Sequence, residues 1–327
     1  MSLVSENHGL TLSIGEILVE FISTKIGIGF QDQLNFRGPY PSGAPAIFID
    51  QCVRIGASTA MIGMVGDDDF GRLNVNRLKA DGVDVSGISV HKKLPTGTAF
   101  VRYRNNGQRD FIFNMWTSAA GKLELSSNVN DTIAKAGHLH IMGTLLGNSK
   151  IWKIIEKAAL EIKSRGGSIS LDPNIRPELL SNSKTNFRFR KILALTNLLL
   201  PSSDELKFVT GICDTHKAID WLFATGVNEI ALKKGASGAT VFTPERIYNE
   251  EPFQVKELDP TGAGDCFGGA YVGCRRMGHD IPISLKYANA AGARNVTIEG
   301  PMEGAGTRLD LDNFMKDHSR RLDDTFS

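Results

Sequence analysis

Residues 259–272 read Asp-Pro-Thr-Gly-Ala-Gly-Asp-Cys-Phe-Gly-Gly-Ala-Tyr-Val. The opening Asp-Pro pair is typical of a turn, and small residues at 262–264 let backbone N–H groups crowd around a bound group. After Asp265, apolar residues recur at helical spacing, so we expect a loop over 259–264 and a helix to about Arg276. The first N–H groups of a helix are unpaired and partly positive, which suits an anion such as phosphate.

The acid at the start of this helix has two interpretations. Asp265 either caps the helix or acts as a general base beside a bound anion. A cap after a glycine turn accounts for one glycine and the acid. It does not account for three consecutive small residues, Gly262, Ala263 and Gly264, directly before the acid. We therefore favour the functional interpretation.

The same stretch resembles the C-terminal signature of the ribokinase-like (PfkB) carbohydrate kinases. Its positions are all met here, by Asp259, Thr261, Gly262, Ala263, Gly264, Asp265, Phe267, Gly269, Ala270 and Tyr271. The resemblance implies a three-layer α/β/α fold with a mostly parallel central sheet and a small β-sheet lid. It also implies that Asp265 is the catalytic base and that the backbone amides of 262–264 bind the transferred phosphoryl group.

The composition is that of a globular protein without a strong charge. Of 327 residues, 41% are hydrophobic and 22% are charged, which allows a sizeable core. The formal net charge is +1, which gives no basic footprint for nucleic acid or an anionic membrane. No apolar run approaches the roughly 20 residues that span a bilayer, and the N-terminus lacks a signal-peptide pattern. We expect a cytoplasmic protein that binds neither nucleic acid nor membrane.

Strand-like and helix-like segments alternate through the second half of the chain. Strand patterns cover 138–143, 168–172, 195–200 and 228–233, and helical patterns cover 149–165, 184–194, 203–210 and 214–225. This alternation favours a mostly parallel sheet with helices on both faces. No clear linker or internal repeat interrupts the chain, so we expect a single domain over residues 1–327.

A second group of strands is expected at about 17–40 and 97–115. Residues 97–115 alternate in polarity around the turn Asn105-Asn106-Gly107, which indicates a hairpin. The two segments together would form the lid over the sugar, and such a lid excludes the water that competes as phosphoryl acceptor. The edge of a lid sheet commonly pairs with a second copy, so we expect a homodimer through the lid.

Two groups of lid residues are candidate sugar contacts. Arg102 and Arg104 resemble the basic lid groups of kinases that act on acidic sugars such as 2-keto-3-deoxygluconate. The alternative is that these charged side chains only keep an edge strand soluble. Glu20 falls where many family members use an aspartate to bind sugar hydroxyls, or it is only the polar face of a strand.

Two more motifs point to the sugar. Ser42-Gly43-Ala-Pro-Ala resembles the family's N-terminal GGAPAN signature, with Gly43 at the sugar, Ser42 in place of a glycine and Ile47 in place of asparagine. Asp-Pro-Asn174-Ile-Arg176 resembles the DPNxR motif of fructokinases and 2-keto-3-deoxygluconate kinases. We expect Asn174 and Arg176 to contact the sugar or a phosphate.

Further segments imply a nucleotide site. Residues 202–205 resemble the family's N-x-x-E segment with serine in place of asparagine, so Glu205 either acts on Mg2+ through water or caps a helix. Residues 233–238 resemble the K-x-G-x-x-G loop that contacts ATP. The implied cofactors are ATP and Mg2+, and a monovalent cation is allowed near the Asp259 loop. The residues expected at the nucleotide are Ser202, Glu205, Lys233, Gly235, Gly238, Thr261 and Asn289.

Three other patterns are discounted. Gly121-Lys122 is followed by Leu123, and G-x-x-x-x-G-K-[ST] occurs nowhere, which excludes a P-loop kinase. The acidic run at 67–69 suits a helix N-terminus better than a metal. His138 and His140 fit a strand with satisfied hydrogen bonds better than a metal site.

The predicted function is ATP-dependent phosphorylation of a hydroxyl of a ketose or a keto-deoxy sugar acid, with Asp265 as the base. The acceptor class stays open, because the lid arginines favour an acidic sugar and Glu20 would repel one. A nucleoside kinase of the same superfamily is the alternative, as is a sensor without catalytic activity, although the intact Asp265 counts against a sensor. A dinucleotide-dependent oxidoreductase would need a G-x-G-x-x-G after the first strand, and Gly15-Glu16 offers none.

Overall fold

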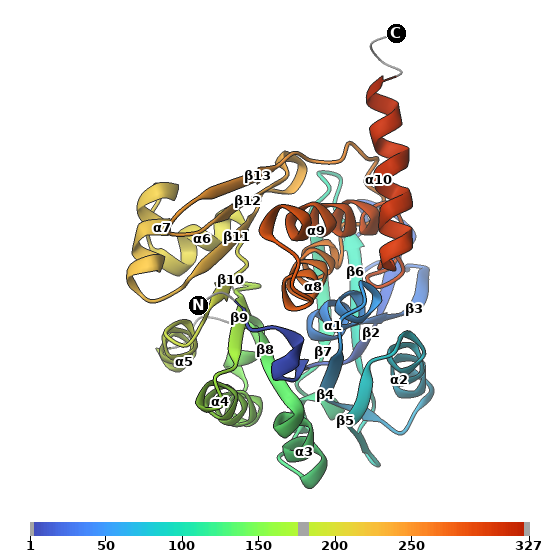
Figure 1. Cartoon of the computed structure of the whole chain (residues 1–327). Helices are drawn as coiled ribbons and strands as arrows, with labels where there is room; N and C mark the ends of the chain where they lie inside the picture. Colours follow the sequence, from blue (N-terminus) through green and yellow to red (C-terminus); the bar gives the residue numbers. More distant parts are fainter. Residues whose placement is uncertain (1–2, 176–182, 324–327) are drawn as a thin grey trace.

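The computed structural model describes residues 3–175 and 183–323, and within them the strands form a nine-stranded sheet and a four-stranded sheet (Figure 1). The strands are β1 (Leu10–Ile14), β2 (Leu18–Ser23), β3 (Phe36–Ser42), β4 (Thr59–Gly66), β5 (Asp84–His91), β6 (Gly97–Tyr103), β7 (Arg109–Asn114), β8 (Ala136–Met142), β9 (Ser168–Asp172), β10 (Leu198–Leu199), β11 (Glu229–Lys233), β12 (Ala239–Phe242) and β13 (Ile247–Glu250). The α-helices are α1 (Ala44–Arg54), α2 (Asp69–Asp81), α3 (Ser127–Lys135), α4 (Ser149–Ser164), α5 (Ser183–Leu193), α6 (Ser203–Thr210), α7 (Thr215–Ala224), α8 (Ala263–Arg276), α9 (Ile281–Asn295) and α10 (Arg308–Asp323). Short 3-10 turns include η3 (Gly143–Gly147) and η5 (Gly235–Ser237).

The large sheet is mostly parallel, as predicted. Its strand order is β13-β12-β11-β10-β9-β8-β1-β4-β5, and the strands from β11 to β5 pair in parallel. Strands β12 and β13 add an antiparallel edge that the sequence interpretation missed. The predicted strand at 195–200 is shorter than expected, since only Leu198–Leu199 pairs as a strand.

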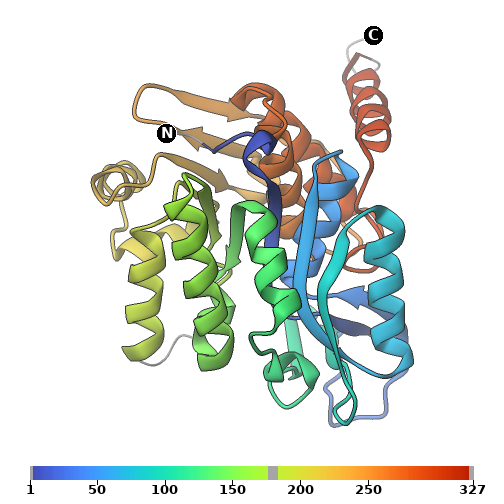
Figure 2. The same ribbon diagram turned by 60° about the horizontal axis from the view of Figure 1, so that its bottom comes forward.

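Helices cover both faces of this sheet. Figure 2 shows α3, α4 and α5 in a row in front of it, with α8 and α9 behind. The central strands are therefore buried on both sides, and every residue of β8 and of β9 is buried. A parallel strand between two helical layers has no solvent face, so even the polar residues of these two strands are buried.

Helix α8 lies at the centre of the molecule (Figure 1) and contains Asp265 and the apolar residues that follow it. Its residues from Cys266 to Cys274 are all buried. It packs backbone to backbone on α1, because a Cβ atom added at Gly269 would lie 2.4 Å from the carbonyl oxygen of Phe48. Any larger residue there would force the two helices apart. The close packing fixes the N-terminus of α8 beside the strand ends of the sheet.

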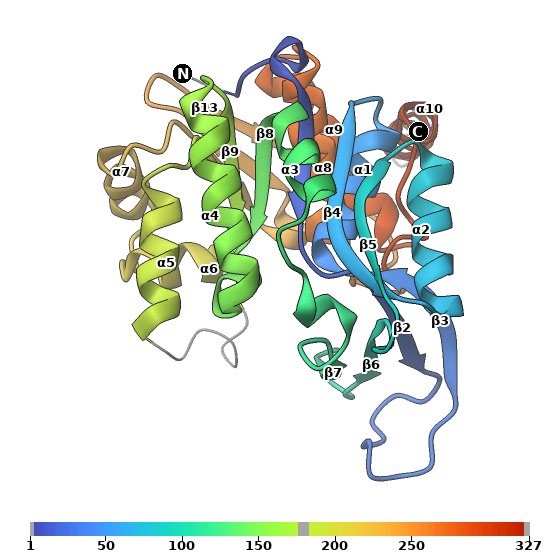
Figure 3. The ribbon, with the colours of Figure 1, turned by 90° about the horizontal axis from the view of Figure 1, so that it is seen from below.

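The four-stranded sheet projects from one end of the large sheet (Figure 3). Its order is β3-β2-β6-β7, and β2 pairs in parallel with β6 while the outer strands are antiparallel. These strands fall at the two segments predicted for the lid, and β6 and β7 form the predicted hairpin. The homodimer through this lid stays a prediction.

The discounted motifs have structural roles. Asp68 is the N-cap of α2 and accepts a hydrogen bond from the Gly71 N–H at 2.8 Å. His138 and His140 are buried and hydrogen-bond to the hydroxyl groups of Ser168 and Ser170. Among the described helices, none combines the length and the apolar character needed to cross a bilayer.

Candidate active site

A cavity of about 650 Å³ lies where the lid meets the C-terminal ends of the central strands. Ligands of open α/β sheets bind at this edge, since the loops after parallel strands converge there. The predicted site residues that line the cavity are Glu20, Gly43, Asn174, Glu205, Lys233, Thr261, Gly262, Gly264 and Asp265. The structure thus brings together predicted residues from lid strand β2, the ends of β3, β9 and β11, helix α6 and the start of α8.

The two predicted lid arginines do not line the cavity. Arg102 Nη2 and Arg104 Nη2 each lie 2.5 Å from a carboxylate oxygen of Asp110. This geometry favours the second interpretation of these residues, as charges that pair along the lid. Arg109, which the sequence interpretation missed, lines the cavity instead. Arg109 begins β7 and directly precedes Asp110, whose carboxylate pairs with Arg102 and Arg104.

Most of the predicted nucleotide residues lie outside the cavity. Asn289 of α9 donates to the carbonyl oxygen of Glu251 at 2.9 Å, and a Cβ at Gly238 would meet the carbonyl oxygen of Glu250 at 2.2 Å. Asn289 therefore holds the segment after β13, and Gly238 allows the close approach of β13. Gly235 lies in η5, and Ser202 caps α6. Ala263 follows Gly262 in α8 without lining the cavity, and Arg176 falls outside the described residues.

The loop before α8 is held by the carboxylate of Asp259, a side chain that is 1% exposed. Asp259 Oδ1 accepts from the Thr261 N–H at 2.9 Å, and Oδ2 accepts from the Gly300 N–H at 2.9 Å. Gly262 then adopts φ +81° as the N-cap of α8. Because this N-cap is a glycine, it has no side chain to satisfy the first N–H groups of α8. A fixed loop that leads into the N-terminus of a helix is suited to an anion.

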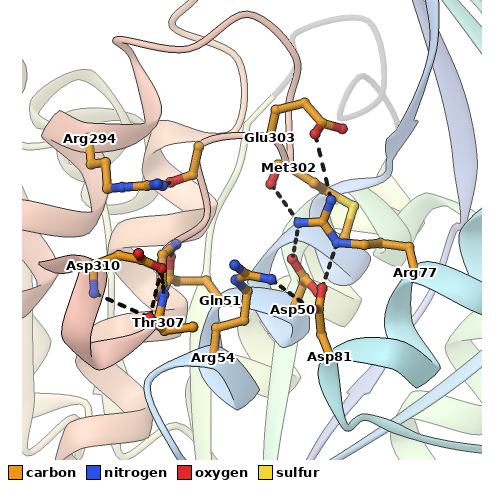
Figure 4. A network of polar contacts seen from close by, with 12 residues as sticks. Asp50, Gln51, Arg54, Arg77, Asp81, Arg294, Met302, Glu303, Thr307 and Asp310 are labelled. Carbon is orange, nitrogen blue, oxygen red and sulfur yellow. Dashed lines mark hydrogen bonds and ion pairs between the residues drawn. The ribbon is translucent and has the colours of Figure 1, made fainter.

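The segment that carries Gly300 is itself held by α1 and α2 (Figure 4). Gln51 of α1 exchanges two hydrogen bonds with the backbone of Gly306, at 2.9 and 3.0 Å. Arg77 of α2 donates to the carbonyl oxygen of Met302 at 3.0 Å and pairs with the buried Asp50 at 3.3 Å. The 300–306 segment, and with it the Asp259 loop, is therefore fixed to the helical core.

A lysine faces the start of α8 across the cavity. Lys233 Nζ lies 2.5 Å from Asp172 Oδ2, and it is 3.5 Å from the position that a Cβ atom would take on Gly264. Desolvation disfavours the charged ammonium, but the carboxylates of Asp172, Glu205 and Asp265 outweigh it and raise the pKa of Lys233. A permanent cation thus lies beside the anion-binding turn.

Glu205 is part of a helix cap and also lines the cavity, while its role toward Mg2+ stays a prediction. Its carboxylate accepts from the N–H groups of Ile175 at 2.8 Å and Ser202 at 2.7 Å, the second as part of a capping box. The same carboxylate lines the cavity. No cluster of three or more His, Cys, Asp or Glu in residues 3–175 and 183–323 could hold a metal ion. Mg2+ is commonly held by one or two carboxylates together with substrate phosphates, and Glu205 is a carboxylate at the cavity that could take this role.

Two acidic residues, Glu16 and Glu20, also line the cavity. Glu16 and Glu20 are 5% and 3% exposed, and Ser42 Oγ donates to Glu20 Oε2 at 3.3 Å. Gly43 follows with φ +114° and opens helix α1. Buried carboxylates lining a cavity are hydrogen-bond acceptors, and a polyol offers matching donors.

Thr144 is a further cavity residue that the sequence interpretation missed. It lies in η3, directly after β8, and is 5% exposed. Its Oγ1 has no hydrogen-bond partner among the described residues. The one sequence signal was its place after a buried strand, where ligand groups gather in such sheets.

The stability of the protein should depend on pH through Asp172. Burial raises the pKa of Asp172 from 3.8 to about 6, against the opposing effect of Lys233. A raised pKa means that the folded state holds a proton that the unfolded state has released. Stability from this group is therefore complete below pH 3.8 and is lost as the pH rises to about 6, by on the order of 3 kcal/mol.

Urea unfolding of the wild type and of Asp172→Asn between about pH 4 and pH 7 checks this. We expect the free energy of unfolding of the wild type to fall relative to the variant as the pH rises to 6, and the difference to stay constant above it. Parallel pH profiles for the two proteins would contradict the assignment.

Comparison with known proteins gives consistent results. The model of the family described as "pfkB family carbohydrate kinase" matches residues 11–308. "Probable fructokinase-5" of Arabidopsis thaliana is 30% identical over 326 residues, covering 96% of this chain and 99% of the relative. An E. coli protein provisionally named Ribokinase II, solved in complex with ATP and Mg2+, is 42% identical with a TM-score of 0.89, covering 95% and 100% of the two chains. A double mutant of Vibrio cholerae O395 fructokinase, in fructose, ADP and potassium ion bound form, is 25% identical with a TM-score of 0.78 and coverages of 93% and 97%.

Proposed function

The chain belongs to the pfkB family of carbohydrate kinases, and from this premise we propose that it transfers the γ-phosphoryl group of ATP to a hydroxyl group of a neutral ketose. The observation that carries the proposal is one cavity lined by two chemically different groups of residues. Gly262, Gly264 and Lys233 suit phosphates, Glu16 and Glu20 suit sugar hydroxyls, and Asp265 lines the same cavity. ATP and Mg2+ are the cofactors, as in the E. coli neighbour.

Charge supports a neutral acceptor over a keto-deoxy sugar acid. The buried carboxylates of Glu16 and Glu20 would repel the carboxylate of an acidic sugar bound beside them. The arginines that would have balanced an acidic sugar, Arg102 and Arg104, are paired with Asp110. Fructokinases are among the relatives of this chain, so fructose is the first neutral ketose to test.

The chain's own residues would carry the transfer as follows. Asp265 would accept the proton of the attacking hydroxyl, and the first N–H groups of α8 would bind the transferred phosphoryl oxygens together with Lys233. Glu205 and Asp172 are the carboxylates available to hold Mg2+ through water. When bound, Mg2+ neutralises charge on the phosphates, and positioning plus charge stabilisation is most of what this chemistry requires.

The monovalent cation near the Asp259 loop remains a prediction. A potassium ion is present in the Vibrio fructokinase structure. In this chain, the described groups around the buried Asp259 carboxylate are hydrogen-bond donors, which leaves its negative charge without a paired cation. The Asp259 carboxylate therefore offers the negative charge that a monovalent cation site needs.

A substrate panel tests the proposed function. ADP release would be measured with ATP and Mg2+ over fructose, tagatose, ribose, 2-keto-3-deoxygluconate and adenosine. We expect the highest kcat/KM with a neutral ketose. Preference for 2-keto-3-deoxygluconate would overturn the neutral acceptor, and preference for adenosine would favour a nucleoside kinase. No turnover with any of the five compounds, with ATP still bound, would favour the sensor.

Substitution of Thr144 tests where the sugar lies. Thr144→Val removes a buried hydroxyl that has no partner among the described residues, so we expect stability to rise by about 1 kcal/mol. If that hydroxyl bonds the sugar, kcat/KM for the sugar should fall by about 10-fold, since a sugar hydroxyl is left unpaired. Thermal unfolding and steady-state kinetics measure the two effects.

Thr59→Val is the matched control for this change. Thr59 Oγ1 is also buried without a partner among the described residues, but Thr59 begins β4 and does not line the cavity. It should raise stability in the same way and leave the kinetics unchanged. Equal kinetics for both variants and the wild type would remove Thr144 from the sugar site.

A further inference from the structure

The lid contacts the loop before α8 at two points. Tyr103 ends β6 and Arg109 begins β7, and the two residues face each other directly across the hairpin. The Tyr103 hydroxyl donates to Asp259 Oδ1 at 2.6 Å, and Arg109 Nη1 donates to Thr261 Oγ1 at 2.8 Å. Both acceptors lie within three residues of Gly262. One cross-strand pair of the lid is therefore seated on the segment that leads into the anion-binding turn.

The other edge of the lid reaches the same place. Tyr40 of β3 donates its hydroxyl to Glu299 Oε1 at 2.8 Å, and Arg37 Nε lies 3.0 Å from the same oxygen. Glu299 directly precedes Gly300, whose N–H donates to Asp259 Oδ2. The lid thus contacts both segments that bond to the Asp259 carboxylate: β6 and β7 contact residues 259–261, and β3 contacts Glu299 beside Gly300.

Tyr103 supplies one of the three hydrogen bonds that satisfy this carboxylate. A buried carboxylate is costly unless its oxygens accept hydrogen bonds, and the other two donors are backbone N–H groups of Thr261 and Gly300. Burial and the nearby Asp259 raise the pKa of Tyr103 well above its ordinary value. The phenol therefore stays a donor throughout the physiological pH range.

The hairpin also forms the wall of the cavity. Phe111 and Phe113, on β7 after Arg109, line it, so a sugar under the lid would touch the strand whose first residue holds Thr261. We propose that Tyr103 is a positioning residue which, through Asp259, couples sugar binding under the lid to the conformation of the anion-binding loop. This inference rests on the proposed kinase function. Its consequence is that a bound sugar strengthens nucleotide binding. A bound nucleotide then strengthens sugar binding by the same factor.

Calorimetric titration of the full chain tests the coupling without turnover. A non-hydrolysable ATP analogue with Mg2+ would be titrated in the presence and absence of saturating fructose, or of the panel sugar with the highest turnover. We expect the sugar to tighten nucleotide binding by about 5-fold or more in the wild type. In Tyr103→Phe the tightening should fall below about twofold, with the sugar-free nucleotide affinity within about threefold of the wild type.

A second readout and two further variants separate positioning from folding. Hydrogen exchange should show sugar-induced protection of amides in 261–265 in the wild type and its loss in Tyr103→Phe. Arg109→Gln removes the second contact and should also reduce the coupling, which keeps the test decisive if Tyr103→Phe is poorly folded. Arg104→Gln lies in the same hairpin, pairs with Asp110 and does not line the cavity, so it should keep the wild-type coupling.

Two results would overturn the inference. One is wild-type coupling in both Tyr103→Phe and Arg109→Gln. The other is a wild type in which the sugar changes nucleotide affinity by less than twofold, because there is then no coupling for these contacts to carry. Failure of the proposed kinase function is seen separately, as an absence of turnover across the substrate panel.

Discussion

Asp265→Asn should lower kcat by about 10²–10⁴-fold while the protein still binds ATP. The range is that of a well-placed general base, and Asp265 lies at the cavity in the first turn of α8. Asparagine keeps the shape and hydrogen-bonding capacity of the side chain but cannot take the proton of the attacking hydroxyl. Steady-state kinetics with the best sugar of the panel, together with a nucleotide titration, measure the two quantities.

The competing role for Asp265 predicts a different result. If the carboxylate only complements the helix dipole, its loss costs about 0.3–1 kcal/mol of stability and leaves turnover near the wild-type value. Asp214→Asn is the matched control, since Asp214 caps α7 away from the cavity and accepts from the Lys217 N–H at 2.9 Å. Asparagine is as good an N-cap as aspartate, so this variant should behave as the wild type.

Gly262→Ala should be the second most damaging change, with a loss of about 10²–10³-fold in kcat, comparable to removal of one donor from an anion hole. Gly262 has φ +81°, which L side chains rarely adopt, and an added Cβ would lie 2.3 Å from the carbonyl oxygen of Pro301. Pro301 belongs to the segment held by Arg77 and Gln51, so it has little room to move. The loop must move instead, and its N–H groups would no longer converge on the anion.

Gly211→Ala separates this displacement from ordinary backbone strain. Gly211 has φ +70° at the C-terminus of α6, with nothing within 4 Å of an added Cβ. It should lose about 1–2 kcal/mol of stability to the left-handed conformation and keep full activity. If both variants lose stability equally and neither loses activity, the loop at Gly262 has no part in phosphate binding.

The sequence was sufficient for those parts of the site that local patterns specify. The turn, the small residues and the helical spacing at 259–276 predicted a loop and a helix, and the structure has α8 at Ala263–Arg276. The alternation of strand and helix patterns predicted the parallel sheet, whose strand ends then had to meet at one edge. Asn174, Glu205 and Lys233 lie at the cavity for that reason, and Glu20 reaches it from β2 of the lid.

The parts that failed depend on contacts between distant segments. The alternating pattern predicted charged residues on the lid hairpin but not which of them faces the cavity. In the structure Arg102 and Arg104 pair with Asp110, and Arg109 lines the cavity. The contact of Tyr103 with Asp259 spans 156 residues, and no local pattern carries it. Strands β12 and β13 have four residues each, too few for a clear period. Thr144 belongs to no motif. It stands out only in the structure, where its buried hydroxyl has no hydrogen-bond partner among the described residues.

The most direct test of the proposed activity is detection of the phosphorylated sugar itself. Mass spectrometry of a reaction of the full chain with ATP, Mg2+ and fructose should show a sugar monophosphate formed in step with ADP, and almost none with Asp265→Asn over the same time. ADP without a sugar phosphate from any neutral ketose, or equal product from the wild type and Asp265→Asn, would contradict the account.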